Sequence, residues 1–153
     1  MLMDVAFEYV PEEDAGLPEE FFREIAISAL EAAGLLSFQE KRIALNAVAV
    51  STEKIRELNR TYREKDSVTD ILSFGEYPDA AAIEAEPAEE VFIGELFFCP
   101  EFIRSAALED GVSLEKEMAY IFSHGVLHLL GYDHTEEMFA IQDKIAEKFS
   151  AAV

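Results

Sequence analysis

Four segments of the chain carry hydrophobic patterns that are typical of β-strands. Residues 4–10 (DVAFEYV) alternate apolar and polar side chains, as a strand with one buried face does. Residues 42–51 are rich in β-branched side chains and alternate more weakly. Two apolar runs complete the set, one at 71–74 (ILSF), which stops at Gly75, and one at 91–98 (VFIGELFF). The pattern therefore predicts about four strands.

Other segments carry the start and stop signals and the spacing of apolar residues that are typical of α-helices. The predicted helices cover residues 18–34, a segment that starts at Ser51 or Thr52, and residues 101–109, 113–130 and 135–149. In the second of these, Ile55, Leu58 and Tyr62 recur at helical spacing, so we expect all three to point inward. Ser113 caps the fourth helix and Gly131 ends it. The sequence thus predicts about five helices.

The predicted order is strand, helix, strand, helix, strand, strand, helix, helix, helix. This order favours an α+β fold in which about four strands form a mixed sheet packed with about five helices. The length of 153 residues suits a single domain spanning 1–153. Residues 76–90 (EYPDAAAIEAEPAEE) interrupt the pattern, because they are acidic, rich in alanine and contain two prolines. We predict an exposed, mobile loop there, since complete elements lie close on either side.

Composition narrows the setting in which the chain works. Apolar residue types make up 50% of the chain, which supports a packed core. The single cysteine, Cys99, cannot form an internal disulfide. The first ten residues lack the features of a secretory signal, and no run is long and apolar enough to cross a membrane. We therefore expect a cytoplasmic protein with no membrane partner.

The charge is strongly negative, but the basic residues are clustered. Thirty-two acidic against twelve basic side chains give a formal net charge of −20, which repels nucleic acid on average. A polyanionic partner would need a local basic patch. Five bases lie within STEKIRELNRTYREK, namely Lys54, Arg56, Arg60, Arg63 and Lys65. This stretch is either such a patch or a solvated helix face, because glutamates are interleaved with the bases.

All three histidines of the chain lie within the motif HGVLHLLGYDH. His124 and His128 are four residues apart, so they share one face of a helix. Gly131 lets the chain leave the helix, and the turn can return His134 to the same ion. Three neutral nitrogens suit zinc and leave a fourth position for water. We predict one Zn²⁺ ion at this helix end, because the alternative, three core or capping histidines, fits the clustering less well.

A metal site of this kind favours chemistry over a structural role. A structural zinc site would use a fourth protein ligand, and none is obvious, since Cys99 lies far off in an apolar run. A zinc ion with an open position lowers the pKa of its bound water to about 7 and polarises an electrophile.

Two carboxylates could orient the histidines. Glu117 lies seven residues before His124, two turns earlier on the same helix face, and Asp133 directly precedes His134. Either could accept a hydrogen bond from the second ring nitrogen of a ligand and so fix its tautomer. Equally, Glu117 could interact with the helix dipole and Asp133 could cap the last helix.

The histidine spacing, H-x-x-x-H-x-x-G-x-x-H, also matches that of the metzincin peptidases. Those enzymes carry a glutamate directly after the first histidine as the general base. Here this position is Gly125, which has no side chain to accept a proton. Peptidase chemistry of that type therefore lacks its base.

The motif HGVLHLLGYDH resembles the signature of the YbeY family, bacterial endoribonucleases that act in ribosomal RNA maturation. The segments ELNRTYREKDSVTDILSF (57–74), IGEL (93–96), EKEMAYIFSHG (115–125) and EEMFAIQDKI (136–145) are similar to further blocks of that family, so that the resemblance covers roughly residues 50–150. Four positions depart from the family pattern, namely Val68, Gly75, Glu95 and Val112. None of them is a predicted metal ligand.

The resemblance implies zinc held by His124, His128 and His134 and an essential arginine at Arg63. It also implies single-strand-specific cleavage of ribosomal RNA, a role in maturation of the 16S rRNA 3′ end on the small ribosomal subunit with its proteins, and ribosome quality control. The planar, permanently charged guanidinium of Arg63 suits phosphate oxygens, although it could instead pair with surface acids.

We interpret the chain as a zinc-dependent endoribonuclease in which Arg63 stabilises charge on the phosphoryl oxygens. The nucleophile would be either zinc-bound water or the 2′-OH of the RNA. Two other hypotheses stay open. One is a metal-dependent peptidase or amidase that shares the histidine spacing. The other is a non-catalytic ribosome assembly factor, in which zinc serves folding and the acidic surface contacts basic ribosomal proteins.

Overall fold

A four-stranded sheet forms the centre of the computed structural model, which describes residues 4–34 and 41–150. Of the predicted domain, residues 1–3, 35–40 and 151–153 lie outside the described part. The strands are β1 (Asp4–Pro11), β2 (Arg42–Ala49), β3 (Ile71–Gly75) and β4 (Glu90–Phe98), arranged in the order β1-β2-β4-β3. β1, β2 and β4 run parallel, and β3 pairs antiparallel with β4. The sheet is therefore mixed, as predicted.

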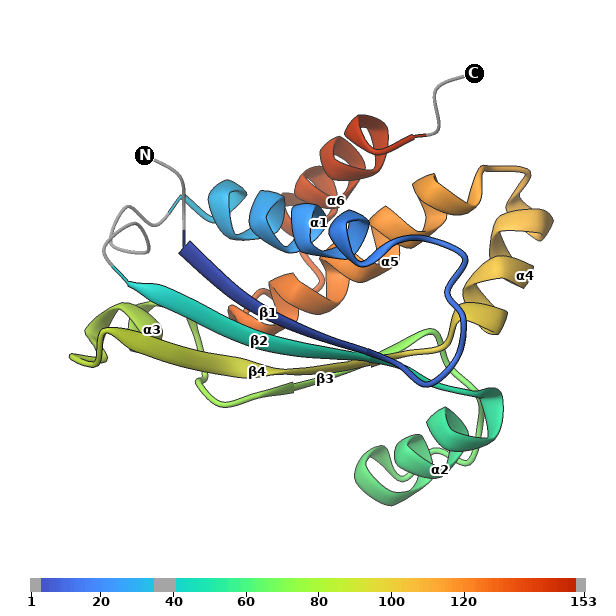
Figure 1. Cartoon of the computed structure of the whole chain (residues 1–153), viewed down its shortest axis with the longest axis horizontal. Coiled ribbons are helices and arrows are strands. Elements are labelled where there is room, and N and C mark those ends of the chain that lie inside the picture. The colour runs from blue at the N-terminus through green and yellow to red at the C-terminus, as the bar shows by residue number, and fades with distance from the viewer. Residues whose placement is uncertain (1–3, 35–40, 151–153) are drawn as a thin grey trace.

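Six helices accompany this sheet in the described residues. They are α1 (Glu19–Ala32), α2 (Thr52–Arg63), α3 (Ala80–Ala85), α4 (Pro100–Asp110), α5 (Leu114–Leu129) and α6 (Glu136–Lys148). α1, α5 and α6 lie on one side of the sheet, whereas α2 lies on the other side at one end (Figure 1). The α+β fold predicted from the sequence is confirmed, with one helix more than expected.

The main core lies between the sheet and the helices α1 and α5. Alternate residues of β1 point into it, as the pattern of residues 4–10 predicted: the Phe7 ring meets Phe122 edge to face at 6.2 Å, and the Tyr9 ring stacks on Phe22 at 5.1 Å. A second, smaller cluster lies beneath α2 and consists of Val48, Val50, Ile55, Leu72 and Cys99. Burial of Cys99 in this cluster keeps the thiol among apolar side chains.

Hydrogen bonds at the helix ends confirm the predicted caps. Ser51 Oγ accepts from the Lys54 N–H at 3.1 Å, and Ser113 Oγ accepts from the Lys116 N–H at 3.1 Å. Each bond satisfies one of the N–H groups that the first turn of a helix leaves free. These caps set where α2 and α5 begin, and with them the positions of the basic residues and of the histidines.

Two details differ from the expectations. Within the segment 76–90, where we expected a loop, Asp79 caps the short helix α3, and Ile83 is fully buried in the main core. A single apolar anchor in an acidic, alanine-rich segment gives no helical periodicity that could reveal it. The inward orientation predicted for Tyr62 is wrong: it is 60% exposed, because α2 buries its first turns and the Tyr62 ring rests edge-on against Phe74.

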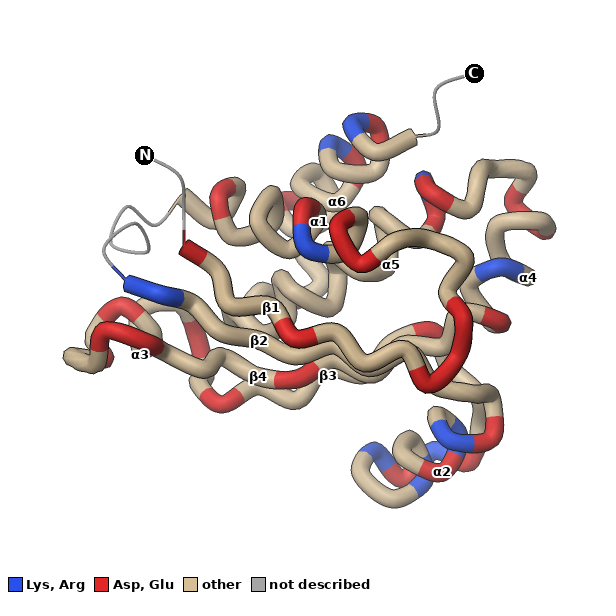
Figure 2. Tube along the Cα trace, in the orientation of Figure 1, with Lys and Arg blue, Asp and Glu red and all other residues tan. Residues whose placement is uncertain are grey.

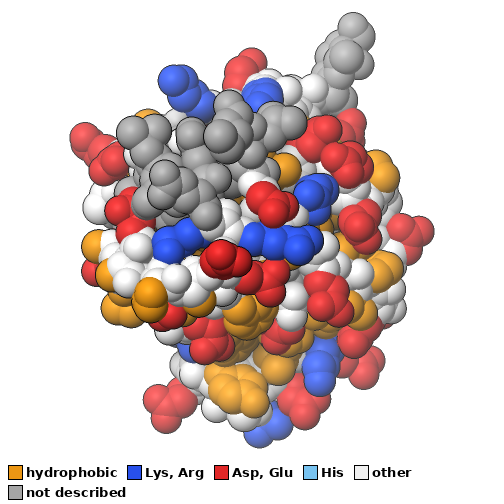
Figure 3. Space-filling view, turned by 60° about the vertical axis from the view of Figure 1, so that its left-hand side comes forward, with side chains coloured by type: hydrophobic (Ala, Val, Ile, Leu, Met, Phe, Trp, Pro, Cys, Tyr) orange, Lys and Arg blue, Asp and Glu red, His pale blue; other side chains and the backbone are white. Residues whose placement is uncertain are grey.

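Acidic side chains are spread along most of the chain, whereas basic ones are concentrated on α2 (Figure 2). The face shown in Figure 3 likewise carries many acidic side chains among few basic ones. None of the helices in the described residues combines the length and the apolar composition needed to span a bilayer.

Candidate metal centre

The three histidines meet at the C-terminal end of α5. One nitrogen of each ring can be chosen such that all three lie within 4.8 Å of one another. His124 and His128 lie one turn apart on α5, with their Nε2 atoms 2.8 Å from each other. His134 follows the helix, and its ring centre lies 5.1 Å from that of His124 and 4.9 Å from that of His128. The convergence predicted from the spacing is therefore present, and the cluster could hold a metal ion.

Gly131 makes the return of His134 possible. Its φ of 84° lies in the left-handed region, which glycine adopts without steric cost. A Cβ atom at this position would approach the Pro78 carbonyl oxygen to 2.6 Å and the Asp79 Cα to 2.7 Å. Conformation and space therefore both favour glycine where the chain turns from α5 toward His134.

The second ring nitrogens of the two helical histidines have acceptors. His128 Nδ1 lies 3.0 Å from the Tyr132 carbonyl oxygen, and His124 Nδ1 lies 3.1 Å from Gln142 Oε1. Gln142 Nε2 donates to the Tyr120 carbonyl at 3.2 Å, which fixes the orientation of the amide. Both Nδ1 atoms therefore carry hydrogen and donate, and both Nε2 atoms present lone pairs.

This arrangement fits a divalent metal ion. Two Nε2 lone pairs that face each other at 2.8 Å repel, and a bound cation turns that repulsion into attraction. Protonation of a ring is the other way to relieve it. However, burial and the neighbouring His124 ring lower the pKa of His128, so its neutral form is favoured. Neutral imidazoles oriented through their other nitrogen are typical zinc ligands.

The two carboxylates considered as partners of the histidines lie in different surroundings. Asp133 Oδ1 accepts from the backbone N–H of His134 and lies 3.8 Å from its Nδ1, so Asp133 is near the cluster. Glu117 lies beside Asp110 and lines a separate hollow. Burial and the Asp110 carboxylate raise the pKa of Glu117. The ring nitrogen of His124 contacts Gln142 instead.

Gln142 is the residue that sequence reasoning missed. It is fully buried on the inner face of α6, between Met138 and Ile145. A polar side chain on an otherwise apolar helix stripe was the available signal, because buried polar groups are usually hydrogen-bonded. The partner could not be inferred, since the contact joins two helices that pack against each other only in the folded chain.

We expect Gln142→Leu to weaken Zn²⁺ binding by about 10- to 100-fold, because His124 loses the acceptor that fixes its tautomer. The affinity is measured by competition with a chromophoric chelator. Asp143→Ala, at the neighbouring exposed position, is the matched control, and thermal melts without metal test whether both variants fold. Unchanged affinity in a folded Gln142→Leu protein would show that the Gln142 contact does not orient the ligand.

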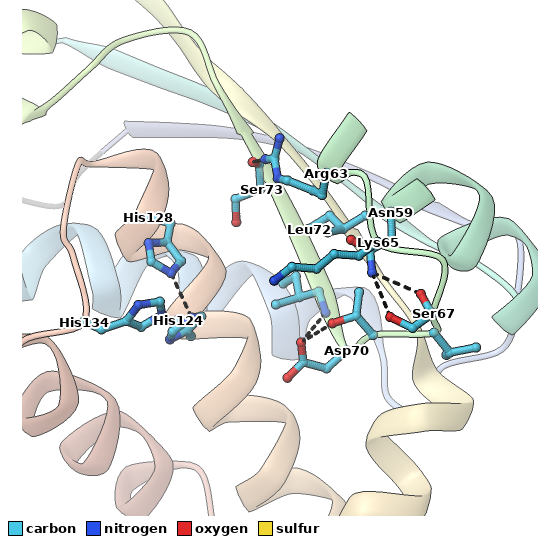
Figure 4. Close-up of a pocket in the computed structure, with 13 residues that line it drawn as sticks. Asn59, Arg63, Lys65, Ser67, Asp70, Leu72, Ser73, His124, His128 and His134 are labelled. Carbon is cyan, nitrogen blue, oxygen red and sulfur yellow. Dashed lines mark hydrogen bonds between the residues drawn. The ribbon is translucent and has the colours of Figure 1, made fainter. Parts of the chain in front are cut away.

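A cavity of about 680 Å³ opens beside the histidines. The three imidazoles line one side, and the end of α2 with the segment that leads into β3 lines the other (Figure 4). Arg63, the last residue of α2, lies in this wall: its Nη2 donates to the Ser73 carbonyl at 2.7 Å, and its guanidinium carbon lies 4.7 Å from the Phe74 ring centre. The cavity thus brings together the three histidines and the arginine predicted from the sequence.

Ser73 connects the two walls of the cavity. Its carbonyl accepts from Arg63, and its hydroxyl donates to the Gly125 carbonyl of α5 at 3.0 Å. Gly125 lies against β3, because a Cβ atom there would come within 2.5 Å of Ile71 Cδ1 and 3.2 Å of Leu96 Cδ2. A glutamate at this position, the general base of the metzincin peptidases, would have to displace Ile71. The site therefore lacks this base and leaves little room for it.

Comparisons with known proteins point to one family. A family model described as Endoribonuclease YbeY matches residues 10–150. The Endoribonuclease YbeY of Lactobacillus acidophilus is 36% identical in an alignment of length 121 that covers 72% of this chain and 70% of that protein. The Endoribonuclease YbeY of Staphylococcus carnosus is 36% identical in an alignment of length 126 that covers 75% of this chain and 82% of that protein.

A solved structure resembles the fold as well. The solution structure of TM1509 from Thermotoga maritima matches with a TM-score of 0.61 and 26% sequence identity, over 95% of this chain and 88% of that chain. The residues matched by the family model include the histidine motif, the basic segment and the strands β2, β3 and β4. The chain therefore belongs to the YbeY endoribonuclease family.

Proposed function

We propose that this protein is a zinc-dependent endoribonuclease that cleaves single-stranded RNA in the cavity beside the histidines. The supporting observation is the meeting of three imidazoles, with two Nε2 atoms facing each other, and an arginine within one cavity. An RNA substrate is what family membership favours. Phosphodiester cleavage needs stabilisation of the charge that develops on phosphoryl oxygens, and this site offers cations for it.

His124, His128 and His134 would hold the ion, which supplies a Lewis acid for the phosphate when bound. Arg63 donates one N–H to the Ser73 carbonyl and rests on the Phe74 ring, and both contacts orient its guanidinium. The remaining N–H groups can donate to the non-bridging oxygens of the scissile phosphate. Gln142 and the Tyr132 carbonyl keep the histidine rings in place through their Nδ1 atoms.

In the cell, we propose the cytoplasm as the location, one domain over 1–153 as the unit, and ribosomal RNA of the small subunit as the substrate. The suggested tasks are maturation of the 16S rRNA 3′ end and ribosome quality control. The net charge of −20 disfavours binding to RNA over most of the surface. Contacts with basic proteins of the small subunit would bring such an acidic enzyme to its RNA.

The test is a cleavage assay with single-stranded RNA, combined with metal analysis of the purified protein. We expect about one zinc ion per chain, in line with one tetrahedral site. Cleavage should stop after treatment with a chelator and return with added Zn²⁺. Duplex RNA of the same sequence is the matched control, and it should stay intact. Peptide turnover that the chelator abolishes, without any RNA cleavage, would favour the peptidase hypothesis instead.

The ends of the products identify the nucleophile. A 2′,3′-cyclic phosphate requires attack by the 2′-OH of the RNA and excludes direct hydrolysis by water. An RNA with one 2′-deoxynucleotide at the cleaved position provides the control, since it stays intact only if the 2′-OH is the nucleophile.

A further inference from the structure

The turn that follows α2 places a second cation at the cavity. α2 ends at Arg63, and Glu64 adopts a left-handed conformation with a φ of 59°, the one positive φ outside glycine in the described residues. The Lys65 N–H then donates to the Asn59 carbonyl at 3.2 Å, which closes the helix end. The chain thereby reverses, and both Arg63 and Lys65 line the cavity.

The residues around Lys65 are held by their own contacts. Asn59, only 4% exposed, donates from Nδ2 to the Ser67 carbonyl at 3.0 Å. Asp66 accepts two hydrogen bonds from Arg56, from Nε at 2.9 Å and from Nη2 at 3.3 Å. Asp66 and Ser67 are therefore fixed to α2, and the backbone of Lys65 is bonded to Asn59. The Lys65 side chain is thus presented to the cavity from a well-anchored turn.

The charges around Lys65 leave its amino group available. It forms no ion pair with any residue of ranges 4–34 and 41–150. Asp70 is the one carboxylate among the described residues that line this cavity, and its Oδ1 already accepts from the Ile71 N–H at 2.6 Å. In Figure 4 the Lys65 side chain extends across the cavity toward the histidines, whereas the Arg63 guanidinium turns to the Ser73 carbonyl.

We propose that Lys65 binds the phosphate that undergoes cleavage, together with Arg63. The inference rests on the proposed function, because it takes RNA as the occupant of the cavity. In a protein with a net charge of −20, phosphate binding requires a local excess of positive charge, and these two side chains are the cations that line the cavity. A lysine ammonium binds phosphate as a compact point charge and complements the planar fork of arginine.

The test compares Lys65→Ala with Lys54→Ala, which removes an exposed lysine from the first turn of α2. We expect kcat/KM for single-stranded RNA to fall on the order of 100-fold in Lys65→Ala, with a decrease in kcat, because the contact is made to the reacting phosphate. Lys54→Ala should keep both constants near those of the wild type.

RNA binding to the chelator-treated protein provides a readout that is independent of cleavage. Measured between 50 and 200 mM KCl, the slope of log K against log salt should decrease by about 0.7 in Lys65→Ala, as expected when one phosphate contact to a single strand is lost. Lys54→Ala should leave the slope unchanged. Thermal melts of the variants exclude unfolding as the cause.

Two results would overturn the inference. If Lys65→Ala and Lys54→Ala have the same kinetics and the same salt slope, Lys65 does not bind phosphate. If Lys65→Ala raises KM alone, the contact is made to a phosphate outside the reacting group. Failure of the proposed function looks different, since the wild type itself would then cleave no RNA.

Discussion

His128→Ala is expected to lose both the metal ion and RNA cleavage. The His128 ring faces both other rings, with ring centres 4.3 Å from His124 and 4.9 Å from His134. Its Nε2 lies 2.8 Å from His124 Nε2, and its Nδ1 is held by the Tyr132 carbonyl. Without it, two imidazoles are left, which is too few for a tight zinc site. Lewis-acid catalysis is worth several kcal/mol, and each 1.36 kcal/mol is tenfold in rate, so we expect a loss of at least about 10³-fold.

Metal content by mass spectrometry and single-turnover cleavage of single-stranded RNA measure the two effects. Circular dichroism of the metal-free wild type and of His128→Ala serves as the control for folding. Full cleavage activity without bound metal would remove the ion from the mechanism. If His128→Ala unfolds and the wild type cleaves no RNA, zinc serves folding, and the assembly-factor hypothesis takes precedence.

Arg63→Ala is expected to lose cleavage while it keeps the metal. The Arg63 guanidinium lines the cavity from α2, whereas the three histidines proposed as metal ligands lie on α5 and in the turn after it. The substitution therefore leaves these histidines intact. Removal of one donor to a developing oxyanion typically costs about 10²- to 10³-fold in rate. We expect a loss of that size in kcat, with zinc still present at the wild-type level.

Two further substitutions make this experiment specific. Arg63→Lys keeps the charge but loses the planar fork, so it should restore part of the lost rate. Arg60→Ala removes an exposed arginine of the same helix that does not line the cavity, and it should behave like the wild type. Wild-type cleavage by Arg63→Ala would show that the guanidinium takes no part in the reaction.

Local patterns predicted the elements of this fold, because each strand and each long helix has a hydrophobic pattern or a capping residue that can be recognised within a few residues. The alternation in residues 4–10 and the caps at Ser51 and Ser113 are examples. Strand order could not be predicted in the same way. β4 lies between β2 and β3, and this placement depends on pairing between segments far apart in the chain.

In the candidate site, too, contacts within a short segment were predictable from the sequence, whereas contacts between separate elements were not. A four-residue spacing brings His124 and His128 together on any helix, and a glycine turn can return His134, so the histidine cluster was predictable. The position of Arg63 beside the histidines was predictable from the family resemblance alone. The contact of Gln142 with His124 and the approach of Gly125 to Ile71 join separate elements, and no short-range pattern encodes such contacts.

The double role of Ser73 has a consequence for how the protein tolerates motion. Arg63 and Gly125 are far apart in the chain, yet both are hydrogen-bonded to Ser73 of β3. Arg63 donates to the Ser73 carbonyl, and the Ser73 hydroxyl donates to the Gly125 carbonyl. A small shift of this strand would therefore carry the guanidinium and the histidine helix in the same direction. Thermal motion of the sheet can then displace the whole site, while the distance between the Arg63 guanidinium and the imidazoles on α5 stays nearly constant.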